Sequence, residues 1–128
     1  MTGFAKRQLP DRFAVLSGPN PPDGLCFSSD NLQILWNNSD ISWSDPRPHY
    51  HQESDEVFLV LRGSVDVEVG DDEVTIGPGE VCFFPAGTWH GIKKTHPPAQ
   101  FLVVRAPTTA DKVYRESCSV PPPDIDDR

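Results

Sequence analysis

The stretch PHYHQESDEVFLVLRG, residues 48–63, joins a histidine pair to the start of an apolar strand. Successive side chains of a β-strand point to opposite faces, so His49 and His51 point one way and Tyr50 points the other. The two imidazoles are then about 6.5–7 Å apart along the strand, close enough for both to reach one metal ion. The polar run 52–55 can turn the chain, and Glu56 then opens the next strand, where it can lie across from the histidine pair.

A third histidine completes a candidate ligand set. His90 follows PAGTW, residues 85–89, four strand-like segments after the first pair. Three neutral imidazole nitrogens and one carboxylate suit a divalent first-row transition metal, and they leave one or two coordination positions open for water, substrate or oxygen. A single histidine in a β protein is more often a surface or hydrogen-bonded residue, and we interpret His96, in KKTHPP, as a loop histidine of that kind.

Short strands separated by Gly and Pro turns fill the rest of the chain. Val65, Val67 and Val69 alternate with acidic residues, which is typical of a strand with one buried face. The predicted strands are residues 32–38, 56–63, 64–70, 73–76, 80–85, 88–92 and 100–106. Most of the 14 prolines fall in four clusters that we expect to be loops or tail. The pattern predicts an all-β sandwich or barrel, and only ADKVYRES, residues 110–117, is expected to form a helical turn or two.

Two motifs resemble the two signatures of the cupin superfamily. The first is H-x-H, four residues, E, six residues, G, and its places are taken by His49, His51, Glu56 and Gly63. The second is G, five residues, P-x-G, two residues, H, and its places are taken by Gly79, Pro85, Gly87 and His90. The family pattern has a glycine where this chain has Trp43 and often an asparagine where it has Lys94. Neither position is a ligand, so the departures concern the surroundings of the pocket.

The resemblance implies a small single-domain cupin with the double-stranded β-helix fold, a jelly-roll barrel that holds its metal inside. The implied metal ligands are His49, His51, Glu56 and His90. The length of 128 residues is that of one domain. We expect the barrel core at about residues 30–107, with residues 1–29 packed on the barrel or on a partner and residues 118–128 forming a tail rich in Pro and Asp.

Composition excludes several classes of function. The chain has 11 Lys and Arg against 19 Asp and Glu, a net charge of −8, which argues against a nucleic-acid binder. We expect no membrane span, because no run of about 18 apolar residues exists, and no secretory signal. The three cysteines are scattered and odd in number, which favours free thiols in a reducing compartment, the cytoplasm. They are Cys26, Cys82 and Cys118.

Three functions stay open at this point. The first is an iron dioxygenase that acts on a small polar or aromatic molecule, with Mn, Ni, Co, Cu or Zn as alternative ions. The second is a metal-dependent isomerase, lyase or decarboxylase without redox chemistry. The third is a non-catalytic cupin that binds a small ligand. The side chains proposed for the substrate pocket are Trp36, Phe58, Val60 and Arg62, although tryptophans in small barrels are more often packing residues.

The strand 56–63 also predicts self-association. If Glu56 points inward, then Val57, Leu59 and Leu61 point outward from the barrel. An outward apolar row needs cover, and the chain has little helix to supply it. The N-terminal segment around Phe13, Val15 and Leu16 can cover part of the row in the same subunit or in a second one. We therefore expect a two-fold homodimer with the apolar row at the interface.

Overall fold

The computed structural model describes residues 3–114, which form nine β-strands and no helix. The strands are β1 (Ala14–Gly18), β2 (Phe27–Ser28), β3 (Gln33–Ser39), β4 (Asp45–His51), β5 (Asp55–Val69), β6 (Asp72–Ile76), β7 (Val81–Phe84), β8 (His90–Ala106) and β9 (Lys112–Tyr114). The all-β prediction is therefore confirmed. Within the described residues no helix is long and apolar enough to cross a bilayer.

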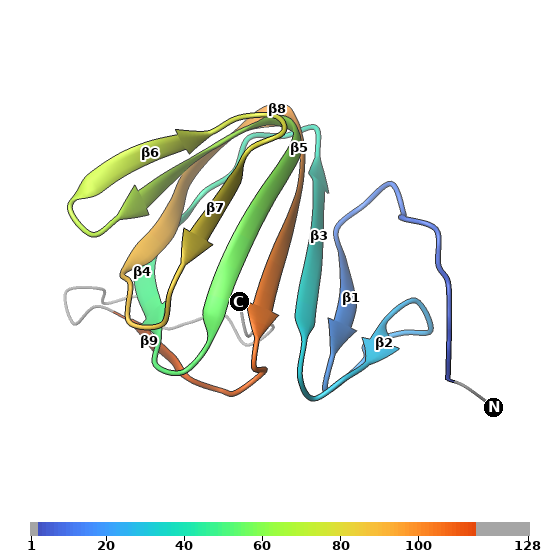
Figure 1. Cartoon of the computed structure of the whole chain (residues 1–128). Helices are drawn as coiled ribbons and strands as arrows, with labels where there is room; N and C mark the ends of the chain where they lie inside the picture. Colours follow the sequence, from blue (N-terminus) through green and yellow to red (C-terminus); the bar gives the residue numbers. More distant parts are fainter. Residues whose placement is uncertain (1–2, 115–128) are drawn as a thin grey trace.

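Two long strands, β5 and β8, organise the molecule because each contributes to two layers. The two strands pair antiparallel along nearly their whole length, from Asp55 with Ala106 to Val69 with His90. One layer runs β7-β5-β8-β3-β1-β2, and the other runs β6-β5-β8-β4-β9. Figure 1 shows the first layer in front, with β4 and β9 behind it. The strands form one folded sheet that does not close, and this arrangement belongs to the predicted jelly-roll class.

A bulge in β5 allows the strand to pass from one layer to the other. The pairing with β8 shifts register between Val60 and Arg62 and again before Ser64. Gly63 lies in this bulge with φ of 71°, a left-handed conformation that favours glycine. A Cβ atom there would lie 2.5 Å from the carbonyl oxygen of Pro98. The turn between layers therefore depends on the glycine of the first motif.

The core lies between the two layers and uses one face of each strand. Phe58 and Val60 come from the first half of β5, and Val65 and Val67 come from its second half. The inward positions change from even to odd numbers across the bulge, because the extra residue reverses the alternation. The other buried apolar side chains of the cluster are Leu35, Ile76, Phe84, Ile92, Phe101 and Val103.

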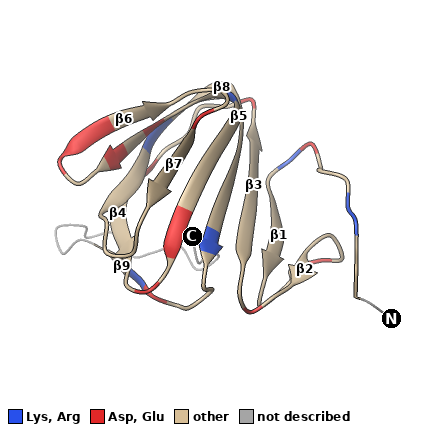
Figure 2. Ribbon diagram, viewed as in Figure 1, with Lys and Arg blue, Asp and Glu red and all other residues tan. Residues whose placement is uncertain are grey.

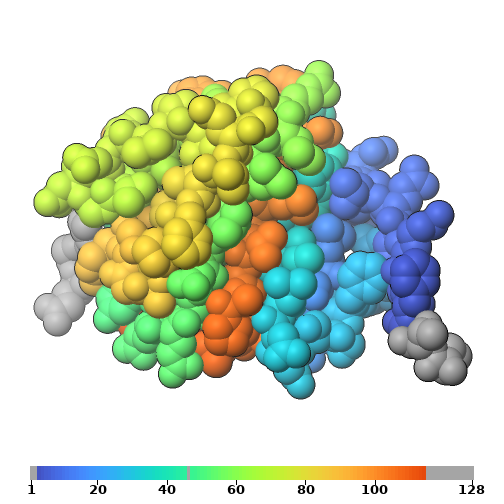
Figure 3. All heavy atoms as spheres, in the orientation of Figure 1, coloured from blue at the N-terminus to red at the C-terminus, as the bar shows by residue number. Residues whose placement is uncertain are grey.

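The outer face of the first layer carries a continuous apolar surface. Its side chains come from neighbouring positions of three strands, because Val57 pairs with Phe83 and Val104, and Leu59 pairs with Val81 and Leu102. Val81 and Phe83 are 65% and 59% exposed. Figure 2 shows few charged residues on these strands, and Figure 3 shows the strands side by side across one face of the molecule. We call this surface, Val57, Leu59, Leu61, Val81, Phe83, Leu102 and Val104, the outer apolar face.

The segment before β1 covers only one end of this layer. Strand β1 pairs with β3, and Ala14 lies opposite Trp36. The indole N–H of Trp36 donates a hydrogen bond to the carbonyl oxygen of Pro10 at 2.8 Å. Trp36 is buried beneath this segment, whereas the exposed side chains on β7 lie at the far end of the layer.

Three local expectations were wrong. Pro46 and Pro48 were expected in a loop but lie within β4. Residues 112–114, expected to be helical, form β9 and pair with β4, while 115–117 and the tail lie outside the described residues. His96 and the prolines at 97–98 were expected in a loop but lie within β8. The prolines fall between the residues that pair with Ser64 and with Arg62, so β8 tolerates them at the bulge, where they interrupt no ladder hydrogen bond. His96 is exposed and contacts Asp66 at 2.8 Å.

Candidate metal centre

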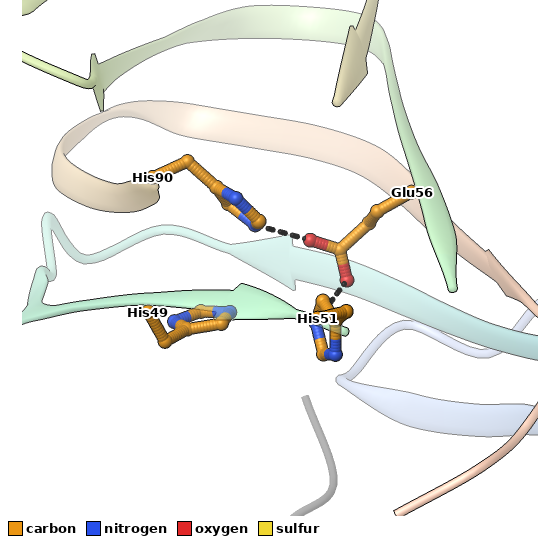
Figure 4. Close-up of side chains that lie close together, drawn as sticks. All are labelled: His49, His51, Glu56 and His90. Carbon is orange, nitrogen blue, oxygen red and sulfur yellow. Dashed lines mark hydrogen bonds and ion pairs between the residues drawn. The ribbon is translucent and has the colours of Figure 1, made fainter. Parts of the chain in front are cut away.

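Four buried polar side chains converge between the two layers. His49 and His51 come from β4, His90 begins β8 directly opposite His49, and Glu56 reaches across from β5. One ligand atom from each residue lies within 4.8 Å of all the others. All four residues are at most 6% exposed. Figure 4 shows the Glu56 carboxylate between His90 and His51, with His49 beside them. The structure thus brings together the four residues that the sequence analysis proposed as metal ligands.

The three imidazole rings present the same nitrogen to the centre. Nδ1 of each ring faces a hydrogen-bond acceptor away from the centre. In His90 and His49 the acceptors are backbone carbonyl oxygens, of Thr88 at 2.9 Å and of Arg47 at 3.4 Å. In His51 the acceptor is the Asp111 carboxylate at 3.0 Å. An imidazole that donates through Nδ1 leaves Nε2 as the metal-binding atom. All three rings are therefore oriented so that Nε2 could bind one shared ion.

Within residues 3–114, the Nε2 atoms of the three histidines lack suitable hydrogen-bond partners, and a bound cation would supply the missing interactions. Nε2 of His49 and of His51 are buried and have no hydrogen-bond partner among the described residues. Nε2 of His90 lies 2.6 Å from a Glu56 oxygen while Nδ1 of the same ring faces Thr88, so both ring nitrogens face acceptors. A neutral imidazole carries one N–H and cannot satisfy both. A divalent ion among the four residues would satisfy the orphaned nitrogens and the carboxylate together, so the donor set fits such an ion.

The environment holds two of the four residues, His49 and Glu56, in the protonation states that metal binding requires. Burial lowers the pKa of His49 to about 3, and electrostatic interactions with the nearby His90 and Lys112 side chains act in the same direction. Burial alone would raise the pKa of Glu56, but its close contacts with His51 and His90 outweigh burial and hold the pKa well below its usual range. His49 is therefore neutral and Glu56 ionised at neutral pH, as ligation demands.

A small cavity adjoins the cluster. His49, Glu56 and His90 line it together with the polar residues Asn37 and Asp45. Its volume is about 20 Å³, which is close to the room that one water molecule needs. A wider groove of about 230 Å³ shares Asn37 and Trp43 with the cavity. The cavity beside the cluster therefore has room for little more than one water molecule.

The four residues proposed for the substrate pocket lie in different places. Phe58 lines the cavity. Val60 is fully buried in the core beyond it. Trp36 points to the opposite face of β3 from Leu35 and Asn37, which line the cavity, and Arg62 is exposed at the bulge.

Sequence reasoning missed a buried polar network behind His51. Asp111 accepts hydrogen bonds from His51, from Arg105 and from the backbone N–H groups of Glu53 and Ser54. Burial would raise the pKa of Asp111, but these hydrogen bonds hold it well below its usual range. The sequence offers little to mark Asp111, because it lies in the segment 110–117 that was expected to be helical and outside both motifs.

Comparison with known proteins agrees with this geometry. The family model of the cupin domain matches residues 42–105, half of the chain, and includes all four clustered residues. The chain belongs to the cupin family. None of the curated proteins searched matches this cupin.

Solved structures share its fold at low sequence identity. KdgF from Halomonas sp. has a TM-score of 0.56 at 22% identity, over 63% of this chain and 73% of that one. TT1209 from Thermus thermophilus has a TM-score of 0.50 at 28% identity, over 80% and 90% of the two chains. Pac13 of Streptomyces, described as a nucleoside dehydratase, has a TM-score of 0.57 at 11% identity, over 68% and 70%.

Proposed function

We propose that this cupin is a metal-dependent enzyme that acts on a small molecule, with one divalent transition-metal ion bound by His49, His51, Glu56 and His90. The observation that carries the proposal is the pair of buried Nε2 atoms, on His49 and His51, that no other group among the described residues satisfies. Leaving such atoms unpaired costs about 1–3 kcal/mol each, a penalty that a bound ion removes. A purely structural role would not require three histidines to turn the same nitrogen toward one carboxylate.

Iron and dioxygenase chemistry form the first version of this proposal. A bound divalent ion would polarise an oxygen atom of the substrate, and a redox-active ion such as iron would also support reaction with dioxygen. The chain's own contribution is to keep His49 neutral and Glu56 ionised and to surround the reacting atoms with Phe58 and other apolar side chains. Manganese, nickel, cobalt, copper and zinc suit the same ligands.

Chemistry without dioxygen is the second version. It draws support from the structural neighbours, which include Pac13, described as a nucleoside dehydratase, and a putative mannose-6-phosphate isomerase from Ralstonia eutropha JMP134. Under this version the ion holds a carbonyl or hydroxyl oxygen, and a group beside the cavity moves a proton. Asp45 is the one carboxylate other than Glu56 among the described residues that line the cavity, which makes it the candidate for that role.

Measuring the native metal and the use of oxygen separates these versions. The protein is purified without a polyhistidine tag and its metal content is determined. Oxygen consumption is then followed with small molecules that carry adjacent hydroxyl groups, and uridine is incubated anaerobically with the Mn²⁺ and Zn²⁺ forms. A product containing both oxygen atoms of O₂ supports the dioxygenase, and anaerobic turnover supports the second version. Stoichiometric ligand binding without turnover supports a non-catalytic binder. Protein that neither contains nor takes up metal overturns the proposal.

Assembly and location complete the proposal. We propose a two-fold homodimer formed through the outer apolar face, because Val81 and Phe83 are more than half exposed there and the segment before β1 covers only the Trp36 end. We propose a reducing, cytoplasmic location, which agrees with the free thiols of Cys26 and Cys82.

A further inference from the structure

The carboxylate of Asp111 has a donor for every acceptor position it offers. Oδ1 lies 3.0 Å from Nδ1 of His51 and 3.2 Å from Nη1 of Arg105. Oδ2 accepts from the backbone N–H of Glu53 at 2.8 Å and of Ser54 at 2.7 Å. Asp111 is only 7% exposed, so each contact forms away from bulk water. A carboxylate with two oxygens and about four lone-pair sites is saturated by this arrangement.

The contact with His51 decides which ring nitrogen faces the metal centre. An ionised carboxylate only accepts hydrogen bonds, so Nδ1 of His51 must carry a proton toward it. The bare Nε2 then faces Glu56, whose nearer oxygen is 3.5 Å away. His49 and His90 obtain the same orientation from backbone carbonyl oxygens. Among the three rings, only that of His51 depends on a side chain that a substitution can remove.

The other oxygen of Asp111 fixes the connection between two ligand-bearing strands. Glu53 and Ser54 belong to the short segment that joins His51 at the end of β4 to Glu56 near the start of β5. The carbonyl oxygen of Asp111 also accepts from the backbone N–H of Gln52 at 3.1 Å. Through these three contacts one residue sets the spacing between His51 and Glu56.

Arg105 makes the burial of this carboxylate possible. Its guanidinium donates to Asp111, to the carbonyl oxygen of Thr109 at 2.7 Å and to the side-chain oxygen of Gln33 at 3.1 Å. A buried carboxylate requires a paired positive charge and full hydrogen bonding, and both are present here. The network therefore supports an ionised Asp111 against His51.

We propose that Asp111 is a positioning residue of the metal centre, which fixes the His51 ring with Nε2 toward the ion and holds the His51–Glu56 segment in register. The inference rests on the proposed metal site and adds to it a residue from outside both sequence motifs. Carboxylates that orient a ligating histidine typically change metal affinity about 10–100-fold when they are removed.

The variant Asp111→Asn tests this role because it keeps the shape and changes the donors. If the amide oxygen faces His51, the amide NH₂ group faces the backbone N–H groups of Glu53 and Ser54, which are also donors. If the NH₂ group faces His51, the ring must accept through Nδ1 and its proton moves to Nε2, the atom that should bind the ion. Either orientation impairs the site.

Co²⁺ binding to the full chain is the measurement, with a chelator in competition and the visible spectrum as a reporter of coordination. Asp111→Asn should lower Co²⁺ affinity about 10–100-fold and change the spectrum. The matched control is Ser17→Ala, which removes a buried hydroxyl that donates to the carbonyl oxygen of Leu32, outside the Asp111 network. Ser17→Ala should lower stability and leave the Co²⁺ affinity nearly that of the unmodified protein.

The outcomes distinguish this inference from the proposed function. Native Co²⁺ affinity and spectrum in folded Asp111→Asn overturn the positioning role alone, provided that His51→Ala abolishes binding. Equal loss of affinity in Asp111→Asn and Ser17→Ala reduces Asp111 to a structural residue and overturns the positioning role too. Absence of Co²⁺ binding in the unmodified protein overturns the metal site itself. If Asp111→Asn does not fold, nitrogen NMR of the Zn²⁺-loaded unmodified protein decides, because the inference requires Nδ1 of His51 to carry the proton.

Discussion

Nε2 of His90 lies 2.6 Å from a carboxylate oxygen of Glu56, although the two residues are 34 positions apart and belong to different strands of the fold. This contact joins the second sequence motif to the first. The other nitrogen of the His90 ring faces the carbonyl oxygen of Thr88, so the ring has acceptors on both sides. An ion between the layers relieves that conflict, which makes metal content the most direct property to test.

Replacing one ligand should remove the metal. In His51→Ala a buried ligand atom is lost, and we expect metal content to fall sharply, because affinity depends on the full set of ligands. His96→Ala is the matched control, since His96 is an exposed histidine outside the cluster that contacts Asp66 at 2.8 Å. Elemental analysis of the two variants checks the prediction, and equal metal in both would falsify the ligand assignment.

Metal removal should destabilise the protein. An ion that binds only the folded state stabilises it by about 2.7 kcal/mol at a free concentration about 100-fold above its Kd. We therefore expect a chelator to lower the thermal midpoint and added Zn²⁺ or Co²⁺ to restore it. The midpoint of His51→Ala should not respond to either addition. A midpoint of the unmodified protein that is the same with chelator and with metal contradicts this expectation.

The metal-free protein should lose stability in mild acid, and His49 should contribute to the loss. Burial lowers the pKa of His49 to about 3 from an ordinary 6.5. Below pH 6.5 the unfolded chain therefore binds a proton at this position that the folded chain does not. The contribution of His49 is fully present above about pH 6.5 and is lost toward about pH 3, at up to about 1.4 kcal/mol per pH unit.

Urea unfolding of the chelated protein from neutral pH into mild acid measures this effect. His49→Gln has no titrating group at the position, so its free energy of unfolding should fall less steeply over the same range. Parallel pH profiles of the two proteins would show that His49 is not held neutral by burial. Glu56 and Asp111, whose pKa values are also lowered, add to the loss at the acid end of the range in both proteins.

The four clustered residues could be predicted because their signal is local. The alternation of a strand places His49 and His51 on one face, and the two motifs supply Glu56 and His90 at fixed spacings. Burial and backbone pairing then bring them together as expected. The same local patterns predicted most strand positions, because β5, β6 and β7 each carry a period-two signal or are bounded by glycine turns.

What the sequence could not provide depends on long-range geometry. Arg62 was proposed for the substrate pocket, but the register of β5 shifts between Val60 and Arg62, and Arg62 is exposed at the bulge. The segment around His96 resembles a loop because of its prolines, yet β8 continues through it. Asp111 is 60 positions from His51 and lies outside both motifs, so only the pairing of β9 with β4 reveals its role.

The bulge itself is open to test through its glycine. Gly63→Ala should destabilise the protein by about 1–3 kcal/mol, because the residue has φ of 71° and an added Cβ would lie 2.5 Å from a backbone oxygen. Gly24→Ala is the control, because its Cβ meets nothing within 4 Å and its φ is not positive. Denaturant unfolding compares the two. Similar stabilities would mean that β5 can pass between the layers without a left-handed residue at this point.

The outer apolar face should govern assembly. Leu59 is half-buried. On the neighbouring strand β7, Val81 lies opposite Leu59 and Phe83 lies opposite Val57, and both are more than half exposed. Exposed apolar area of this kind is removed from water when two copies associate, at about 25 cal/mol per Å². We expect the unmodified protein to be a dimer by light scattering at tens of micromolar. Leu59→Glu and Phe83→Glu should give monomers or insoluble protein, because a charge at the centre of the interface remains unpaired.

The control is Ile41→Glu, a change at a 75% exposed apolar residue outside the outer apolar face, which should leave the dimer intact. A monomeric unmodified protein, or a dimer that survives both substitutions, would show that this face is not the interface.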